Sequence, residues 1–135
     1  MAIIIMTVKI YTGKSGILKN ICEFDKLQHT GETVYSFGYE GGFDRVLGKV
    51  DWSEKKTKFC GVFAAHKGAR GSTTKRTKIR YVKAGKGNIE VAIWKDTVRI
   101  FKLTKNAPFV LVIKDKAIAA GFMNYWKLLW KQGRK

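Results

Sequence analysis

Residues 109–131 read Phe109-Val-Leu-Val-Ile-Lys-Asp-Lys-Ala-Ile-Ala-Ala-Gly-Phe-Met-Asn-Tyr-Trp-Lys-Leu-Leu-Trp-Lys131, and their pattern gives the clearest prediction of the fold. It begins with the continuous apolar run Phe109–Ile113, which is typical of a strand covered on both faces. Apolar residues then recur at helical spacing: Ile118, Phe122, Tyr125, Trp126 and Leu129. Asp115 at the start of this segment and Lys127, Lys131, Arg134 and Lys135 towards its end suit the helix dipole. We therefore expect a buried strand followed by an amphipathic helix packed on a sheet.

The segments before this stretch add strands and one further long helix. Ile89–Trp94 alternates between the β-branched residues Ile89, Val91 and Ile93 and the set Glu90, Ala92 and Trp94. Thr97–Leu103 follows after Lys95-Asp96, which predicts a hairpin. Ile3–Ile10 is rich in β-branched residues and predicts the first strand. Thr12–Gly16 is expected to be a turn in which Ser15 caps the next helix. The inward stripe of that helix is expected to contain Ile17, Leu18, Ile21, Cys22 and Leu27.

The middle of the chain is less regular. Its expected elements are a strand at Val34–Gly38, a short helix within Gly41–Val50, a helix from Trp52 capped by Asp51, a loop through Gly68–Ser72 and a strand around Ile79–Val82. Phe59–Ala65 is short and apolar, so its pattern suits a strand and a helix equally. Together these segments predict an α/β fold in which helices sandwich a mixed β-sheet, as a single domain over residues 1–135.

Composition and charge narrow the class of protein. The chain is 45% hydrophobic, enough for a packed core, and its formal charge of +17 favours polyanionic partners such as DNA or RNA. Cys22 and Cys60 form no C-x-x-C pair and are expected to be buried thiols. There is no signal-peptide pattern and no apolar run of membrane-spanning length, so we expect a cytoplasmic protein with no membrane contact.

The basic middle segment is the sharpest candidate site. No acidic residue occurs from Lys55 to Lys86, whereas Lys and Arg are frequent and hydroxyl residues and Tyr81 lie among them. The predicted nucleic-acid contacts are Lys67, Arg70, Lys75, Arg76, Lys78, Arg80 and Lys83. The alternative is that this segment is a solvated surface. Tyr125, Trp126 and Trp130 could form a base-stacking platform, but their helical spacing favours core packing.

No catalytic or metal-binding motif is complete. Phosphodiester transfer by a histidine nucleophile uses the pattern H-x-K-x-x-x-x-D, in which the lysine balances phosphate charge. Here His66 and Lys67 are adjacent, and His29 is followed two residues later by Gly31. Cys60 and His66 lack the further ligands that a zinc site needs. We therefore expect no catalytic residue, no metal and no cofactor.

Four colinear segments resemble the effector-sensing domain of TrmB-like transcription regulators. They are Lys9–Ile17, Glu32–Gly38, Gly87–Val98 and Phe109–Lys131. The resemblance implies a phospholipase D-like fold, a role in transcription regulation and a small-molecule effector of the sugar class. It assigns no effector-binding residue in this chain. Regulators of that kind read DNA with a separate winged helix-turn-helix, and because the first predicted strand begins near Met1, we expect none in this chain.

Three functions follow from these observations. The first is a non-enzymatic regulatory domain that binds a small effector or a partner protein, for example a separate helix-turn-helix chain. The second is a nucleic-acid-binding module that uses the Lys55–Lys86 segment. The third is a degenerate phospholipase-like enzyme, which the broken H-x-K spacing disfavours.

Overall fold

The computed structural model describes residues 6–28, 32–39, 42–48, 58–64, 77–83 and 87–134. Their secondary structure runs β1 (Thr7–Thr12), α1 (Gly13–Leu27), β2 (Thr33–Tyr39), α2 (Gly42–Leu47), β3 (Lys58–Ala64), β4 (Thr77–Val82), β5 (Ile89–Trp94), β6 (Thr97–Lys102), β7 (Phe109–Lys114) and α3 (Lys116–Gln132). The expected helix from Trp52, the loop through Gly68–Ser72 and residues 3–5 of the first strand lie outside the described residues.

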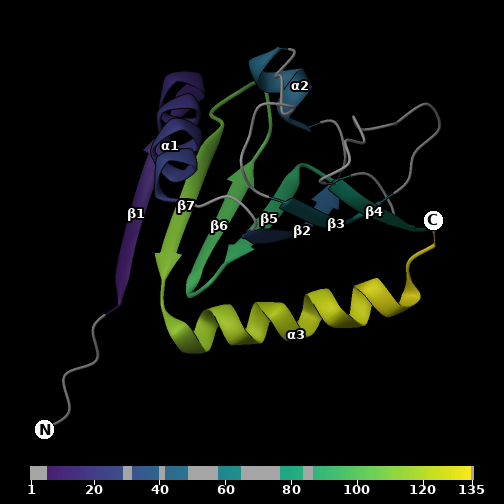
Figure 1. Cartoon of the computed structure of the whole chain (residues 1–135). Coiled ribbons are helices and arrows are strands. Elements are labelled where there is room, and N and C mark those ends of the chain that lie inside the picture. The colour runs from purple at the N-terminus through teal and green to yellow at the C-terminus, as the bar shows by residue number, and fades with distance from the viewer. Residues whose placement is uncertain are drawn as a thin grey trace, which may run out of the picture.

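The strands form one seven-stranded sheet in the order β1-β7-β6-β5-β2-β3-β4. The strands β2, β3 and β4 are parallel to one another, and the remaining neighbours are antiparallel. The sheet is therefore mixed, as predicted. Helices α1 and α2 lie on one face and α3 lies on the other (Figure 1), so the expected sandwich is confirmed.

Each face of the sheet has its own hydrophobic core. The α1/α2 side buries Ile17, Phe24 and Phe101, whereas the α3 side buries Val62, Ile93 and Trp126. The alternation of β5 explains this division, because neighbouring residues of a strand point to opposite faces. Val91 and Ile93 accordingly pack under α3, and Ala92 packs towards α1.

The expected stripe of α1 was partly wrong. Ile17 and Ile21 are buried as predicted, but Leu18 and Leu27 are largely exposed and Cys22 is exposed. Asn20 and Phe24 are buried instead. At about 100° per residue, positions 17, 20, 21 and 24 share one face, and positions 18 and 22 lie to its side.

The expected turn at Thr12–Gly16 was also wrong, because α1 already begins at Gly13. Gly13 adopts φ +75°, a conformation open to glycine, and this allows the chain to pass from strand to helix at one residue. Thr12 is the N-cap residue, without a side-chain capping bond, and Ser15 lies inside the helix.

The expected burial of β7 on both faces is correct for one face only. Val110 is fully buried on the α1 side. On the other side Phe109, Leu111 and Ile113 are only half-buried, because α3 packs mainly against β2 to β6. Tyr125 is likewise 64% exposed rather than part of the core stripe, since it points about 100° away from Trp126 around α3.

The ambiguous segment at residues 59–65 supplies the strand β3. It pairs with β2 on one side and β4 on the other, and Val62, Phe63 and Ala64 are all buried. The predicted β5–β6 hairpin is confirmed, with Lys95 at φ +53° in its turn. None of the helices in the described ranges combines the length and the apolar character that a membrane crossing requires.

Candidate functional site

The basic strand β4 meets the end of α3 at one edge of the sheet. The backbone N–H of Arg134 donates to the carbonyl oxygen of Tyr81 at 2.8 Å, and the N–H of Tyr81 donates to the carbonyl oxygen of Arg134 at 2.6 Å. These bonds form an antiparallel bridge on the outer side of β4. Two basic segments that are about fifty residues apart in the sequence therefore lie side by side (Figure 1).

Arg80 anchors this junction. Its Nη1 donates to the carbonyl oxygen of Trp130 at 2.8 Å, and its Cζ lies 4.1 Å from the centre of the Trp130 ring. The guanidinium thus adds a charged donor to a carbonyl at the negative end of α3, which also accepts from the Gly133 N–H at 3.3 Å, and it stacks on an aromatic ring. Gly133 is required here, because a Cβ at that position would lie 2.8 Å from the Cβ of Arg80.

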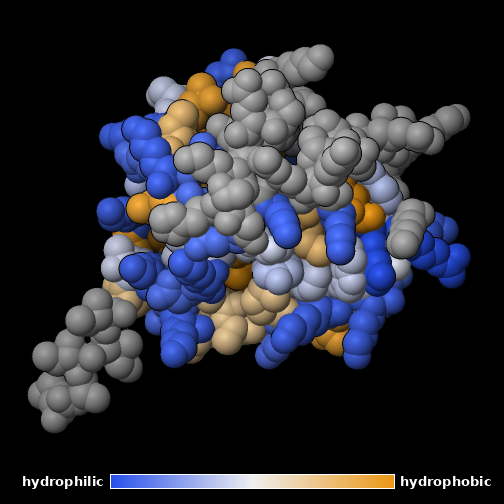
Figure 2. All heavy atoms as spheres, in the orientation of Figure 1, coloured by the Kyte–Doolittle hydropathy of each residue, from blue (hydrophilic) through white to orange (hydrophobic). Residues whose placement is uncertain are grey.

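The basic residues of these two joined segments define what we call the β4–α3 basic surface. Its members are Lys78, Arg80 and Lys83 from β4 and its end, and Lys127, Lys131 and Arg134 from α3 and its end. Arg80 is half-buried and the other five are exposed. No acidic residue occurs in 77–83 or 116–134. Figure 2 shows hydrophilic side chains along the C-terminal half of α3 and around the C-terminus.

Three of the seven predicted contact residues lie on this surface. They are Lys78, Arg80 and Lys83, and the other four, Lys67, Arg70, Lys75 and Arg76, lie outside the described residues. The sequence prediction missed Lys127, Lys131 and Arg134 as members of the same surface. The four-residue spacing of Lys127 and Lys131 along one helix face was visible in the sequence, but the proximity of α3 and Arg134 to β4 was not.

The described residues contain no cluster of three or more His, Cys, Asp or Glu side chains that could hold a metal ion. His29 and His66 lie outside the described residues. Burial raises the pKa of the Cys60 thiol, although the nearby positive charges of Lys78 and Arg80 act in the opposite direction. Cys60 is therefore a neutral, half-buried thiol at neutral pH and is not poised as a nucleophile.

A second cation is buried on the opposite face of the sheet. Arg99 is 6% exposed, its Nη1 donates to Oδ1 of Asn20 at 3.2 Å, and its Cζ lies 3.4 Å from the centre of the Phe24 ring. Its Nε has no hydrogen-bond partner among the described residues. Burial lowers the pKa of Arg99 to about 9, against the opposing effect of Glu90, so the side chain stays charged at neutral pH.

The comparison with solved structures identifies the fold. The structure of NucT from Helicobacter pylori superposes with a TM-score of 0.66 at 11% identity, and covers 96% of this chain and 99% of that chain. Nuc from Salmonella typhimurium, a phospholipase D family member, gives 0.60 at 16% identity and covers 96% and 97%. The fold is phospholipase D-like.

TrmBL2, described as an archaeal chromatin protein with a novel mode of DNA binding, shares this phospholipase D-like fold. It gives a TM-score of 0.61 at 12% identity over 95% of this chain and 53% of that chain, so this chain spans about half of its length. The sequence itself matches no protein-family profile and no curated protein. Identities this low establish the fold alone.

Proposed function

We propose that this chain is a non-enzymatic, phospholipase D-like domain of the TrmB-like regulatory kind, and that it binds the phosphate backbone of nucleic acid. One observation carries the proposal: two basic segments, distant in sequence and each without an acidic residue, join at the junction of β4 and α3. The fold of the chromatin protein TrmBL2, which binds DNA, adds support.

The geometry suits phosphate better than bases. Exposed lysines present flexible point charges, which position a protein on a polyanion but read little sequence. Arg80 is held by Trp130 and contributes charge without being free to form a bidentate base contact. We therefore expect strongly salt-dependent binding with weak sequence preference.

A salt titration tests this proposal. Lys78, Lys83 and Lys131 are exposed, and changing all three to glutamine should weaken binding to duplex DNA while leaving the fold intact. Each lost phosphate contact should reduce the slope of log affinity against log salt by about 0.9. Fluorescence anisotropy over a range of salt concentrations measures both effects.

The matched control is the triple change of Lys14, Lys26 and Lys105 to glutamine, which removes the same charge from exposed positions outside the β4–α3 basic surface. It should retain most of the affinity and the slope. The proposal is wrong if the control variant loses as much affinity as the test variant, or if the unmodified protein does not bind at micromolar concentration near physiological salt.

The absence of catalysis is part of the same proposal. Neither histidine in the sequence is followed two residues later by lysine, since Gly31 and Gly68 occupy those positions. Neither histidine therefore has the lysine that, in the H-x-K pattern, balances the charge of a phosphoryl group. We expect no cleavage of plasmid DNA or of a chromogenic phosphodiester. Turnover that is lost in His66→Ala but kept in His29→Ala would overturn this expectation.

The resemblance to TrmB-like sensors also implies a sugar-class effector and a separate winged helix-turn-helix partner. No contact in the described residues identifies either one, and both stay predictions of the resemblance. A thermal-shift screen with sugars and a binding assay with a separate helix-turn-helix chain would test them independently of the DNA titration.

A further inference from the structure

The two edge strands of the sheet, β4 and β1, differ in the pairing of their outer backbone groups. The outer edge of β4 is partly closed, because Arg134 exchanges backbone hydrogen bonds with Tyr81. The outer edge of β1 has no pairing partner within the described parts of the chain. The strand β1 is six residues long and contains no proline, so its free edge offers a template for another strand.

The direction of the backbone groups of β1 follows from one hydrogen bond. The N–H of Gly13 donates to the carbonyl oxygen of Pro108 at 2.8 Å and continues the β1–β7 ladder by one step. Because the direction of the backbone groups alternates along an antiparallel strand, the N–H and C=O groups of Lys9 and Tyr11 also point towards β7. Val8, Ile10 and Thr12 therefore direct their N–H and C=O groups outward from the sheet.

The same strand exposes apolar side chains on the α3 side of the sheet. Val8 is 49% exposed and Ile10 is 62% exposed. Their neighbours on β7, Ile113 and Leu111, are half-buried, because α3 packs mainly against other strands. An unpaired backbone edge beside an apolar face is the combination that favours association with a further strand.

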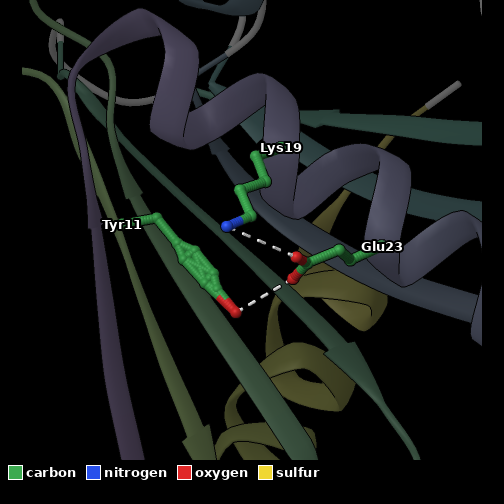
Figure 3. Close-up of polar contacts among 3 residues, drawn as sticks. All are labelled: Tyr11, Lys19 and Glu23. Atoms are coloured by element: carbon green, nitrogen blue, oxygen red, sulfur yellow. Dashed lines mark hydrogen bonds and ion pairs between the residues drawn. The ribbon is translucent and has the colours of Figure 1, made fainter.

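The α1 side of β1 carries a carboxylate. The Tyr11 hydroxyl donates to Oε2 of Glu23 at 3.1 Å, and Nζ of Lys19 lies 4.0 Å from Oε1 of the same side chain (Figure 3). Lys9 is exposed and, two residues before Tyr11, shares its face of the sheet. Opposite charges therefore lie along one side of the free edge.

We propose that a second copy of this chain pairs antiparallel with β1, with the two-fold axis at Ile10, so that the two sheets become continuous. Ile10 then lies opposite the partner's Ile10, and Val8 lies opposite the partner's Thr12. Each of these pairs exchanges both backbone hydrogen bonds, so all the outward groups of β1 are used. This interface is independent of the β4–α3 basic surface at the other edge of the sheet.

The side chains favour this register over one centred on Lys9. Directly opposite residues have Cβ atoms about 4.5–5.5 Å apart, and like charges there are unfavourable. A shift that centred the axis on Lys9 would bring Lys9 against the partner's Lys9. The proposed register instead sets Lys9 opposite the partner's Tyr11, beside the partner's Glu23.

The test is a sedimentation-velocity concentration series on protein freed of nucleic acid. Because each copy carries a formal charge of +17, it is run near 0.15 M salt, where the screening length is about 8 Å. The unmodified chain should form a dimer. Ile10→Pro should be monomeric yet folded, because proline removes only an outward N–H and edge strands tolerate it there. Leu128→Ser, which changes an exposed apolar residue on α3, should stay dimeric.

A charge exchange decides the register and does not depend on proline. Lys9→Glu should weaken the dimer about fivefold by placing two carboxylates together, and adding Glu23→Lys should restore the affinity. A chain that stays monomeric up to roughly 100 μM overturns the proposal. So does a dimer that is unaffected by both Ile10→Pro and Lys9→Glu.

Discussion

Replacing Trp126 with alanine should lower the free energy of unfolding by about 3–5 kcal/mol. The side chain is 6% exposed and lies between α3 and the middle of the sheet. Its ring stacks on Trp130 with centroids 5.1 Å apart and meets the edge of Tyr35 at 4.8 Å. Removing it would leave a large cavity into which rigid sheet residues cannot collapse.

The indole N–H of Trp126 adds to this loss. Nε1 lies 3.2 Å from the carbonyl oxygen of Ser36 and 3.2 Å from that of Cys60, so it bridges β2 and β3. Alanine would leave these carbonyls without that donor. Urea unfolding followed by circular dichroism gives the difference in stability. Tyr125→Ala is the matched control, and because Tyr125 is 64% exposed its stability should stay close to that of the unmodified protein. Equal stability of Trp126→Ala and Tyr125→Ala would contradict the packing described here.

Asn20→Leu should destabilise the protein by about 3 kcal/mol, because it removes a hydrogen-bond partner of a buried charge. Oδ1 of Asn20 accepts from Nη1 of Arg99 at 3.2 Å, and both residues are buried between α1 and β6. The aromatic ring of Phe24 stabilises the guanidinium but offers no hydrogen-bond acceptor.

Replacing both partners should recover much of that loss. In the double variant Asn20→Leu with Arg99→Met, the polar pair becomes an apolar one of similar size, and such exchanges are often neutral or stabilising. A double-mutant cycle from denaturant unfolding measures the coupling between the two positions. If the double variant is less stable than Asn20→Leu alone, Arg99 contributes through a contact other than Asn20. Lys19→Leu, one residue earlier on the exposed side of α1, controls for the added leucine.

Of the β4–α3 basic surface, the β4 residues were predictable from the sequence and the α3 residues were not. An acid-free run of basic residues is visible in the sequence, and the prediction of Lys78, Arg80 and Lys83 rests on it. Lys131 and Arg134 were interpreted as partners of the helix dipole, which is a local property. Their position beside β4 depends on α3 crossing the sheet to its far edge, and local spacing carries no information about that crossing. Arg80 also proved to be an anchor for α3, because Trp130 lies within reach only after the chain has folded.

Elements with a local pattern follow directly from the order of the residues. The alternation of Ile89–Trp94, the two-residue turn at Lys95-Asp96 and the stripe containing Phe122 and Trp126 each set a strand, a hairpin or a helix, because side-chain period and backbone period coincide there. The tertiary structure alone decided that residues 58–64 form a central strand, because a short apolar run takes its conformation from the strands that pair with it. It also decided which cations meet at the β4 edge and that the edge of β1 stays unpaired within the described chain, since strand order arises from contacts between distant segments and leaves no periodic trace in the sequence.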